Sequence, residues 1–319
     1  MEERVLTVEN LDICLYKNGK YVAQVVENIN FKVFSGEIIG IIGESGSGKT
    51  VISKSIINLL SSNLKITNGS ALFDGIDLFK LRKKFFYDIR GKKIALIPQD
   101  SLHALNPLHK LHKQISETRV IHEVESKGNT NFAVNLLRKV GIHRPEDRAN
   151  QYPHQFSGGM KQRAVIASSM SIEPKLIIAD EPTTALDVTV QKKIINLIKS
   201  LKSTINSSFI FISHNLGLVS EICDRIYVVY AGRIVEEGTV KEIFSNSMHP
   251  YTRALIESTP NLNYDRESLV AIPGNIPSIE DEIRGCRFKN RCSIMTEKCS
   301  EIPDCRIISD THKSFCWNT

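Results

Sequence analysis

The residues with the clearest chemistry form a glycine-rich loop at positions 43–50. The loop reads Gly-Glu-Ser-Gly-Ser-Gly-Lys-Thr and fits the pattern G-x-x-x-x-G-K-S/T, whose glycines let backbone N–H groups converge on a phosphate. Lys49 can reach the β- and γ-phosphates of a nucleotide, and the hydroxyl of Thr50 can bind Mg²⁺. An apolar run precedes the loop and a helical pattern follows it, which is the setting that phosphate binding requires. The predicted nucleotide contacts are Gly43, Glu44, Ser45, Gly46, Ser47, Gly48, Lys49 and Thr50.

Two acidic residues follow a second apolar run. Residues 176–179 are all apolar and are followed by Asp180 and Glu181, as expected of a buried strand whose carboxyl end carries a site. Asp180 can hold Mg²⁺ directly or through water, and Glu181 can polarise a water molecule for in-line attack on a γ-phosphate. Alone, the pair would be read as two solvated acids in a turn. Together with a phosphate loop in the same chain, it indicates nucleotide hydrolysis.

A second anion-receptive helix start lies at residues 156–163, which read Phe-Ser-Gly-Gly-Met-Lys-Gln-Arg. Ser157 can cap a helix that begins at Gly158, so that backbone N–H groups and the helix dipole face an anion. One nucleotide pocket does not need two such helix starts. We therefore expect this loop to cover a nucleotide that is held by a different subunit.

Composition limits the remaining possibilities. The chain has 319 residues, of which 41% are hydrophobic and 24% charged, and its net charge is +6, which is ordinary for a globular protein. Basic residues are scattered rather than gathered into a stripe with aromatic residues, which argues against nucleic acid as a partner. No apolar run reaches the length of a membrane-spanning helix, and the first residues lack signal-peptide character. The chain alone is therefore expected to be soluble and cytosolic, with the possibility of docking onto a membrane protein.

These motifs must be positioned by a framework of strands and helices. Apolar or alternating runs predict strands at residues 5–8, 12–16, 25–34, 70–73, 93–97, 176–179, 209–213, 226–230 and 233–237. Helical patterns cover residues 49–60, 80–90, 111–123, 131–140, 158–170, 189–203 and 216–223. Strands that alternate with helices indicate an α/β fold. After about residue 246, scattered prolines predict an irregular, loop-rich tail.

Taken together, these motifs resemble those of the ATP-binding cassette (ABC) ATPases, in which two cassettes meet head to tail with two ATP molecules between them. The resemblance implies a P-loop NTPase cassette over residues 1–245, with a RecA-like core, an antiparallel β subdomain and an α-helical subdomain at about residues 100–165. It also implies that Ser157, Gly158, Gly159 and Gln162 are the signature residues of the second subunit's ATP site.

The same resemblance assigns roles to residues that carry no clear signal alone. Gln99 matches the glutamine that touches Mg²⁺ and the attacking water, and Asp187 matches the aspartate that crosses the dimer interface. His214, which follows a predicted strand, matches the histidine that contacts the γ-phosphate. Tyr16 is the best match to the aromatic residue that stacks on adenine, and Tyr21 is its competitor.

The residues after 245 resemble those of one group within the ABC ATPases. Residues 249–255 (His-Pro-Tyr-Thr-Arg-Ala-Leu) and 272–277 (Ile-Pro-Gly-Asn-Ile-Pro) are similar to the C-terminal extension of the ATPases of oligopeptide and dipeptide importers. Residues 246–319 are accordingly expected to form a Cys-rich extension of that type. The same family includes ATPases for the uptake of nickel, metallophores and glutathione.

Five of the seven cysteines lie after residue 285, which in a cytosolic protein indicates metal binding more than disulfides. The resemblance implies a [4Fe-4S] cluster held by Cys286, Cys292, Cys299 and Cys316, with Cys305 as a possible replacement for Cys316. Zinc suits the same four thiolates, and free thiols are the third possibility. The expected role is structural, because a loop-rich tail has little core of its own.

The hypothesis that follows is an ATP-hydrolysing, Mg²⁺-dependent subunit that powers the import of oligopeptides or dipeptides by a bacterial ABC transporter. Its expected partners are a second ABC ATPase subunit, either a paralogue or a second copy, two membrane-spanning permease subunits and an extracellular solute-binding protein. It would then lie peripherally on the cytoplasmic face of the cell membrane. One alternative is the ATPase of a nickel or metal-chelate importer. Another, from a different class, is a soluble ABC ATPase that acts on ribosomes or DNA, against which the single cassette and the absence of a heptad run argue.

Overall fold

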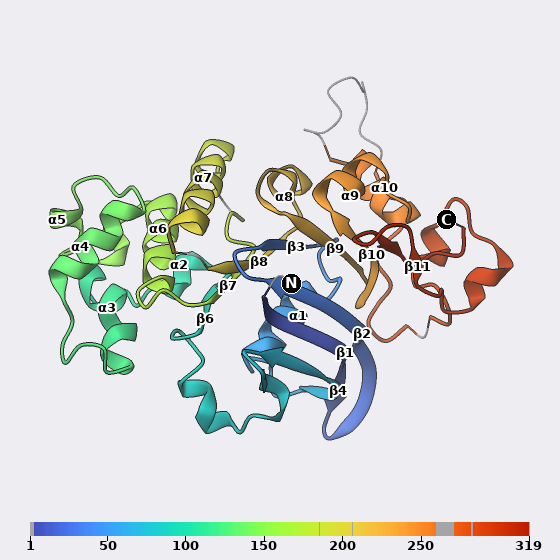
Figure 1. Cartoon of the computed structure of the whole chain (residues 1–319), viewed down its shortest axis with the longest axis horizontal. Helices are drawn as coiled ribbons and strands as arrows, with labels where there is room; N and C mark the ends of the chain where they lie inside the picture. Colours follow the sequence, from blue (N-terminus) through green and yellow to red (C-terminus); the bar gives the residue numbers. More distant parts are fainter. Residues whose placement is uncertain (1–2, 185, 206, 260–270, 282, 319) are drawn as a thin grey trace. The chain divides into compact units, whose positions relative to one another are not determined.

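The structure is a computed structural model that describes residues 3–184, 186–205, 207–259, 271–281 and 283–318 (Figure 1). Positions 260–270 of the expected extension therefore lie outside the described residues. The chain divides into two compact units: unit 1 comprises Met1–Leu81 and Phe211–Thr319, and unit 2 comprises Arg82–Ile210. The N-terminal strands and the Cys-rich extension thus belong to the same unit.

The first sheet of unit 1 is antiparallel and begins with a long hairpin. Strands β1 (Arg4–Lys17) and β2 (Lys20–Phe34) are joined by Asn18-Gly19, both with positive φ, as a two-residue hairpin turn requires. Strands β4 (Leu64–Phe73) and β5 (Ile76–Asp77) complete the order β2-β1-β4-β5. The sequence predicted three shorter strands here. The structure instead has two continuous ones, interrupted only by register shifts that include the region of Asn10.

The second set of strands in unit 1 carries the phosphate loop. Strand β3 (Ile38–Ile42), buried along its length, pairs in parallel with β9 (Arg225–Tyr230), which forms a hairpin with β10 (Arg233–Thr239). Helix α1 (Lys49–Ile56) follows the phosphate loop, and α8 (Leu216–Ile222) packs on β3. This packing is close, since a Cβ at Gly40 would lie 3.0 Å from Val219 Cγ1. The predicted strand–loop–helix order is confirmed.

The extension is more regular than the sequence predicts. After α9 (Val240–Ser245) it begins with helix α10 (Pro250–Glu257), and its end adds β11 (Arg306–Ile307) and β12 (Lys313–Ser314) beside β10. Two short 3-10 turns, η5 (Lys289–Arg291) and η6 (Glu297–Ser300), lie between them. The prolines that suggested an irregular tail include Pro250, which occupies the first turn of α10, where its missing N–H costs nothing.

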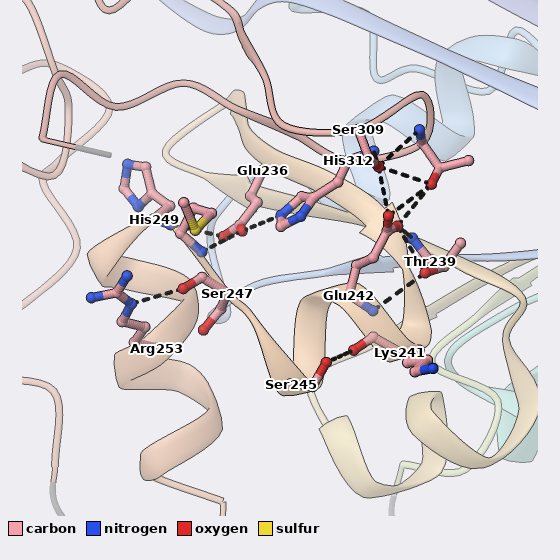
Figure 2. A network of polar contacts seen from close by, with 12 residues as sticks. Glu236, Thr239, Lys241, Glu242, Ser245, Ser247, His249, Arg253, Ser309 and His312 are labelled. Carbon is pink, nitrogen blue, oxygen red and sulfur yellow. Dashed lines mark hydrogen bonds and ion pairs between the residues drawn. The ribbon is translucent and has the colours of Figure 1, made fainter.

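A buried polar network fastens the extension to β10 (Figure 2). The carboxylate of Glu236 accepts hydrogen bonds from the backbone N–H groups of Met248 (2.6 Å) and His249 (3.0 Å) and pairs with His312 Nε2 at 2.8 Å. Glu236 and His312 are both fully buried, so these contacts satisfy polar groups that water does not reach. Nearby, Glu242 of α9 accepts hydrogen bonds from the Ser309 and Thr311 hydroxyls.

Unit 2 combines a parallel strand pair with a group of helices. Strands β6 (Ile94–Ile97) and β7 (Leu176–Asp180) pair in register from Ile94 and Leu176 onward. The helices are α2 (Ser101–Ala104), α3 (Leu111–Ile121), α4 (Thr130–Lys139), α5 (Pro145–Arg148), α6 (Gly158–Ser169) and α7 (Val188–Ile205). The helix predicted at residues 80–90 is wrong: that stretch contains the 3-10 turn η2 (Lys83–Tyr87) instead of an α-helix. Strand β8 (Ser208–Ser213) spans the point at which the sequence passes from unit 2 back to unit 1.

Within the described residues, no helix combines the length and the apolar character needed to cross a membrane.

Candidate nucleotide-binding and hydrolysis site

The phosphate loop has the backbone that its glycines were expected to allow. Gly43 has a φ of 153°, and a Cβ at this position would lie 2.1 Å from the carbonyl oxygen of Val229, so only glycine fits. Gly48, at the start of α1, has a φ of 100° in the left-handed region. The N–H groups of this turn and of the helix start are the donors for a bound phosphate.

The side chain of Lys49 is folded back into the loop. Only 4% of the residue is exposed, and its Nζ donates to the carbonyl oxygens of Gly43 (2.9 Å) and Glu44 (2.8 Å). A third, longer contact reaches Ser47 Oγ at 3.4 Å. The loop therefore holds a buried positive charge through carbonyl groups, in the place where an anion would meet it. Thr50 follows directly in the first turn of α1, as a Mg²⁺ ligand must.

A cavity of about 350 Å³ opens beside the phosphate loop. Gly46 lines it, together with Tyr21 of β2, Ala231, and two stretches of the extension, residues 276–281 and 283–284, with Arg287. Tyr16 is not among its lining residues; its ring lies under Lys65 Nζ at 4.8 Å and meets Tyr21 edge-on at 6.2 Å. The geometry thus places Tyr21, the competitor in the sequence analysis, on the cavity that reaches the loop.

The acidic pair of unit 2 lies at the end of β7, as predicted. Asp180 is the last residue of the strand and is 2% exposed, whereas Glu181 begins the turn with a φ of 48°. This left-handed backbone is uncommon for a residue with a side chain and is typical of functional turns. The Glu181 carboxylate accepts hydrogen bonds from Gln99 Nε2 (3.0 Å) and Thr184 Oγ1 (2.9 Å). Gln99, assigned by the resemblance, and Glu181 are therefore in direct contact.

The signature residues occupy the start of α6. Ser157 is the N-cap residue, and its side chain makes no capping hydrogen bond with the backbone N–H groups of the first turn. Gly159 must be small, because a Cβ there would lie 2.7 Å from Val190 Cγ1 of α7. Gln162 is 2% exposed, and its Nε2 has no hydrogen-bond partner among the described residues, so its side chain faces the interior. That burial speaks against a direct contact between Gln162 and a nucleotide on another subunit.

Two further predicted residues lie at element ends. Asp187 caps α7, because its Oδ1 accepts a hydrogen bond from the N–H of Val190 at 2.9 Å. His214 follows β8 in unit 1 and is exposed. The phosphate loop and His214 thus belong to unit 1, and Gln99, Asp180, Glu181 and the signature belong to unit 2.

The sequence analysis missed two residues of the extension that contact the phosphate loop. Tyr251 Oη accepts a hydrogen bond from the N–H of Glu44 at 2.8 Å, and Arg291 pairs with the Glu44 carboxylate. Tyr251 was noted only as part of a family-like motif, and Arg291 belongs to no motif. No local signal could have revealed either contact, since the partners lie more than two hundred residues from Glu44 in the sequence.

The cysteines of the extension are gathered without forming a site for a single metal ion. No group of three or more His, Cys, Asp or Glu side chains in the described parts of the chain could hold such an ion. Burial, together with the neighbouring Cys299, Cys316 and Cys292, raises the pKa of the Cys286 thiol to about 11. Cys305 differs from Cys286: burial also raises the pKa of its thiol, but the charged groups that influence it are Lys313 and Glu237 rather than other cysteines.

Comparison with known families agrees with the geometry. Residues 26–184 match the model of the ABC transporter family, and residues 235–299 match that of the oligopeptide/dipeptide transporter C-terminal region. The second match covers the α10 motif and three of the four predicted cluster cysteines.

Curated relatives match over nearly the whole chain. The oligopeptide transport ATP-binding protein OppD of Bacillus subtilis (strain 168) is 46% identical over 98% of this chain and 88% of its own length. The dipeptide transport ATP-binding protein DppD of the same strain is 42% identical over 99% of this chain and 95% of its own. A probable peptide ABC transporter ATP-binding protein, y4tR of Sinorhizobium fredii, is also 42% identical, over the same shares.

Solved structures support the cassette fold. The ATP-binding cassette MJ0796, in a dimeric post-hydrolysis state bound to ADP and phosphate, matches with a TM-score of 0.65 and 26% identity over 74% of this chain and 98% of its own. The site and the fold thus define an ATPase of the ABC class. More narrowly, the chain belongs to the family of oligopeptide and dipeptide transport ATP-binding proteins.

Proposed function

We propose that this chain hydrolyses ATP to power the import of oligopeptides or dipeptides through a membrane ABC transporter. The observation that carries the proposal is the Gln99–Glu181 contact at the end of β7, in a chain that also folds a phosphate loop around Lys49. The match of the extension to the oligopeptide/dipeptide C-terminal region supports peptides as the cargo.

The chemistry assigned to this chain's own residues is phosphoryl transfer to water. The N–H groups of the loop and Lys49 bind the β- and γ-phosphates, while Thr50 and Asp180 would hold Mg²⁺, which neutralises charge on the phosphates when bound. Glu181 takes a proton from the attacking water molecule. Gln99 orients Glu181 and that water molecule. His214 contacts the γ-phosphate, and Tyr21, which lines the cavity beside Gly46, stacks on the base.

The ATP site of one chain is half of a complete one. Residues 157–159 cover the nucleotide of a second cassette, and the corresponding residues of that cassette cover the nucleotide held here. Asp187 lies at the same contact. We infer that the second cassette is a paralogue and that the pair acts with two permease subunits and a solute-binding protein at the cytoplasmic face of the membrane. The permeases and the binding protein carry the cargo, so a nickel or metal-chelate importer is the alternative.

We further propose that the extension holds a [4Fe-4S] cluster through Cys286, Cys292, Cys299 and Cys316. Support comes from the donor set: four thiols of one segment that influence each other's titration, with Cys305 outside the group. A cluster is larger than one ion, so its ligands stand further apart than the thiolates around a single zinc, the competing occupant. The cluster's role is to fix the loop-rich segment between α10 and β11. Anaerobically purified protein should be brown and contain iron; colourless protein with stoichiometric zinc would contradict the cluster.

The test of the transport function is an affinity purification of the chain from detergent-solubilised membranes. We expect two permease subunits and a second cassette to co-purify, with ATPase activity that peptide-loaded binding protein stimulates. Stimulation by a nickel-loaded or chelate-loaded binding protein alone would replace the peptide assignment. Co-purification of ribosomes or DNA without permeases would overturn transport altogether.

A further inference from the structure

Glu44, the second residue of the phosphate loop, is held by the extension at two points. Its backbone N–H donates to Tyr251 Oη of α10 at 2.8 Å. Its carboxylate accepts two hydrogen bonds from Arg291, at 2.8 Å and 3.0 Å, in the bidentate geometry that makes arginine–carboxylate pairs strong. Its carbonyl oxygen, in turn, accepts from Lys49 Nζ. One loop residue thus joins the extension to the lysine that binds phosphate.

The two residues that hold Glu44 are themselves firmly placed. The Arg291 side chain is 5% exposed, its Nη1 also donates to Tyr230 Oη at 3.3 Å, and its Nε donates to the carbonyl oxygen of Pro273 at 2.8 Å. The rings of Tyr230, Tyr251 and Phe288 contact one another, with centroids 4.6 to 5.3 Å apart. Such a packed aromatic group fixes the direction of the polar groups it carries.

Arg291 also compensates the negative charge of the Glu44 carboxylate. A phosphate loop gathers positive charge and N–H groups for a triphosphate, yet Glu44 places a carboxylate in the same loop. Burial alone would lower the pKa of Arg291, but its hydrogen bonds to Glu44 and Tyr230 raise it, so the guanidinium stays charged. The ion pair neutralises the Glu44 carboxylate beside the incoming anion. The Glu44 side chain is only 27% exposed, so solvent would screen its charge incompletely.

From these contacts we propose that Arg291 and Tyr251 are positioning residues for ATP binding. They hold Glu44, and through its carbonyl oxygen Lys49, in the conformation that receives the β- and γ-phosphates, and Arg291 cancels the charge of Glu44. The extension therefore contributes to the nucleotide site of its own chain. The inference rests on the proposed ATPase function of the loop.

The experiment measures the Kd of a fluorescent ATP analogue for the full-length chain and six variants. Arg291→Gln should weaken binding about tenfold, because it leaves a carboxylate unpaired near the phosphates. Arg291→Lys keeps the positive charge but loses the bidentate hydrogen bonding of the guanidinium. Its Kd should lie between those of Arg291→Gln and the wild type. Arg306→Gln, at an exposed arginine of β11 in the same extension, is the matched control and should bind as the wild type does.

A double variant separates positioning from general damage. Glu44→Gln removes the carboxylate, so adding Arg291→Gln to it should weaken binding far less than Arg291→Gln does in the wild-type background. If Arg291→Gln lowered the affinity equally in both backgrounds, or left it unchanged, the inference would be overturned while the proposed function stood. If the wild-type chain bound no ATP analogue at all, the proposed function would fail first. Tyr251→Phe, with its thermal melting point measured alongside, tests the backbone contact and should weaken binding about threefold without unfolding the chain.

Discussion

The phosphate loop and the Glu181 turn differ in how completely their own chain supports them. The loop is bonded from within by Lys49 and from outside by the extension, through Tyr251 and Arg291. The Glu181 turn has a left-handed backbone and two side-chain partners, Gln99 and Thr184, which come from its own unit. The phosphate loop is thus held by segments more than two hundred residues away in the sequence, whereas the Glu181 turn is held from within unit 2.

The largest expected effect is a loss of ATP hydrolysis without a loss of ATP binding. Glu181→Gln should lower ATP turnover by roughly 10²–10⁴-fold, the usual contribution of a general base, while ATP binding to the isolated subunit is retained. Steady-state ATPase assays of the assembled transporter, with nucleotide binding measured separately, check both halves. Wild-type turnover in this variant would remove Glu181 from the mechanism.

The second prediction concerns the start of α6. Gly158→Asp places a carboxylate at a helix N-terminus meant for phosphate, so turnover in the assembled transporter should fall by roughly a hundredfold. The isolated subunit should bind ATP as before, because this loop is proposed to cover the nucleotide of the second cassette. Equal loss of binding in the isolated subunit would show that the signature serves its own chain.

A smaller effect decides which tyrosine meets the base. Tyr21→Ala should weaken ATP binding about fivefold or more, the lower range for loss of stacking on a base, because Tyr21 lines the cavity beside Gly46. Tyr16→Ala is the matched control, since that ring packs against Lys65 instead. The reverse result would restore Tyr16 to the role.

The last prediction concerns stability and tests the packing around His249. Burial, with a contribution from Arg253, lowers the pKa of His249 to about 3, so this side chain stays neutral in the folded chain. A histidine whose pKa is lower when folded adds stability above its unfolded value of 6.5 and loses it as the pH falls. From pH 6.5 to 5, this loss should approach about 1.4 kcal/mol per pH unit.

The matched variant is His249→Asn, whose side-chain oxygen can replace Nδ1 as the acceptor of the Tyr251 N–H. Denaturant titrations between pH 7 and 5 should show a shallower loss of stability in this variant than in the wild type. An identical slope in both proteins would mean that His249 is not the titrating group.

The phosphate loop and the Glu181 turn could both be predicted from the sequence, because each is formed by residues that are close together in the chain. Three sites are of this kind: the phosphate loop, the acids after β7 and the start of α6. Each is a short residue pattern next to the strand or helix that positions it, so residues close together in the sequence are enough to predict it. The Glu44–Arg291 pair could not be predicted, because its two residues lie 247 positions apart in the sequence and neither stands in a pattern that points to the other. The bulged course of β1 was missed for a related reason: the irregularity near Asn10 looks like a strand end, yet pairing with β2 and β4 carries the strand through it.

The discontinuity of unit 1 has a consequence for the synthesis of the chain. The phosphate loop leaves the ribosome early, but Tyr251, Arg291 and the strand β12 that seals the sheet beside β10 leave it much later, after the whole of unit 2. Domains generally fold as units while the chain grows. The nascent chain therefore carries an unbraced loop through most of its translation, and the loop gains its full affinity for ATP only after Tyr251 and Arg291 have been made.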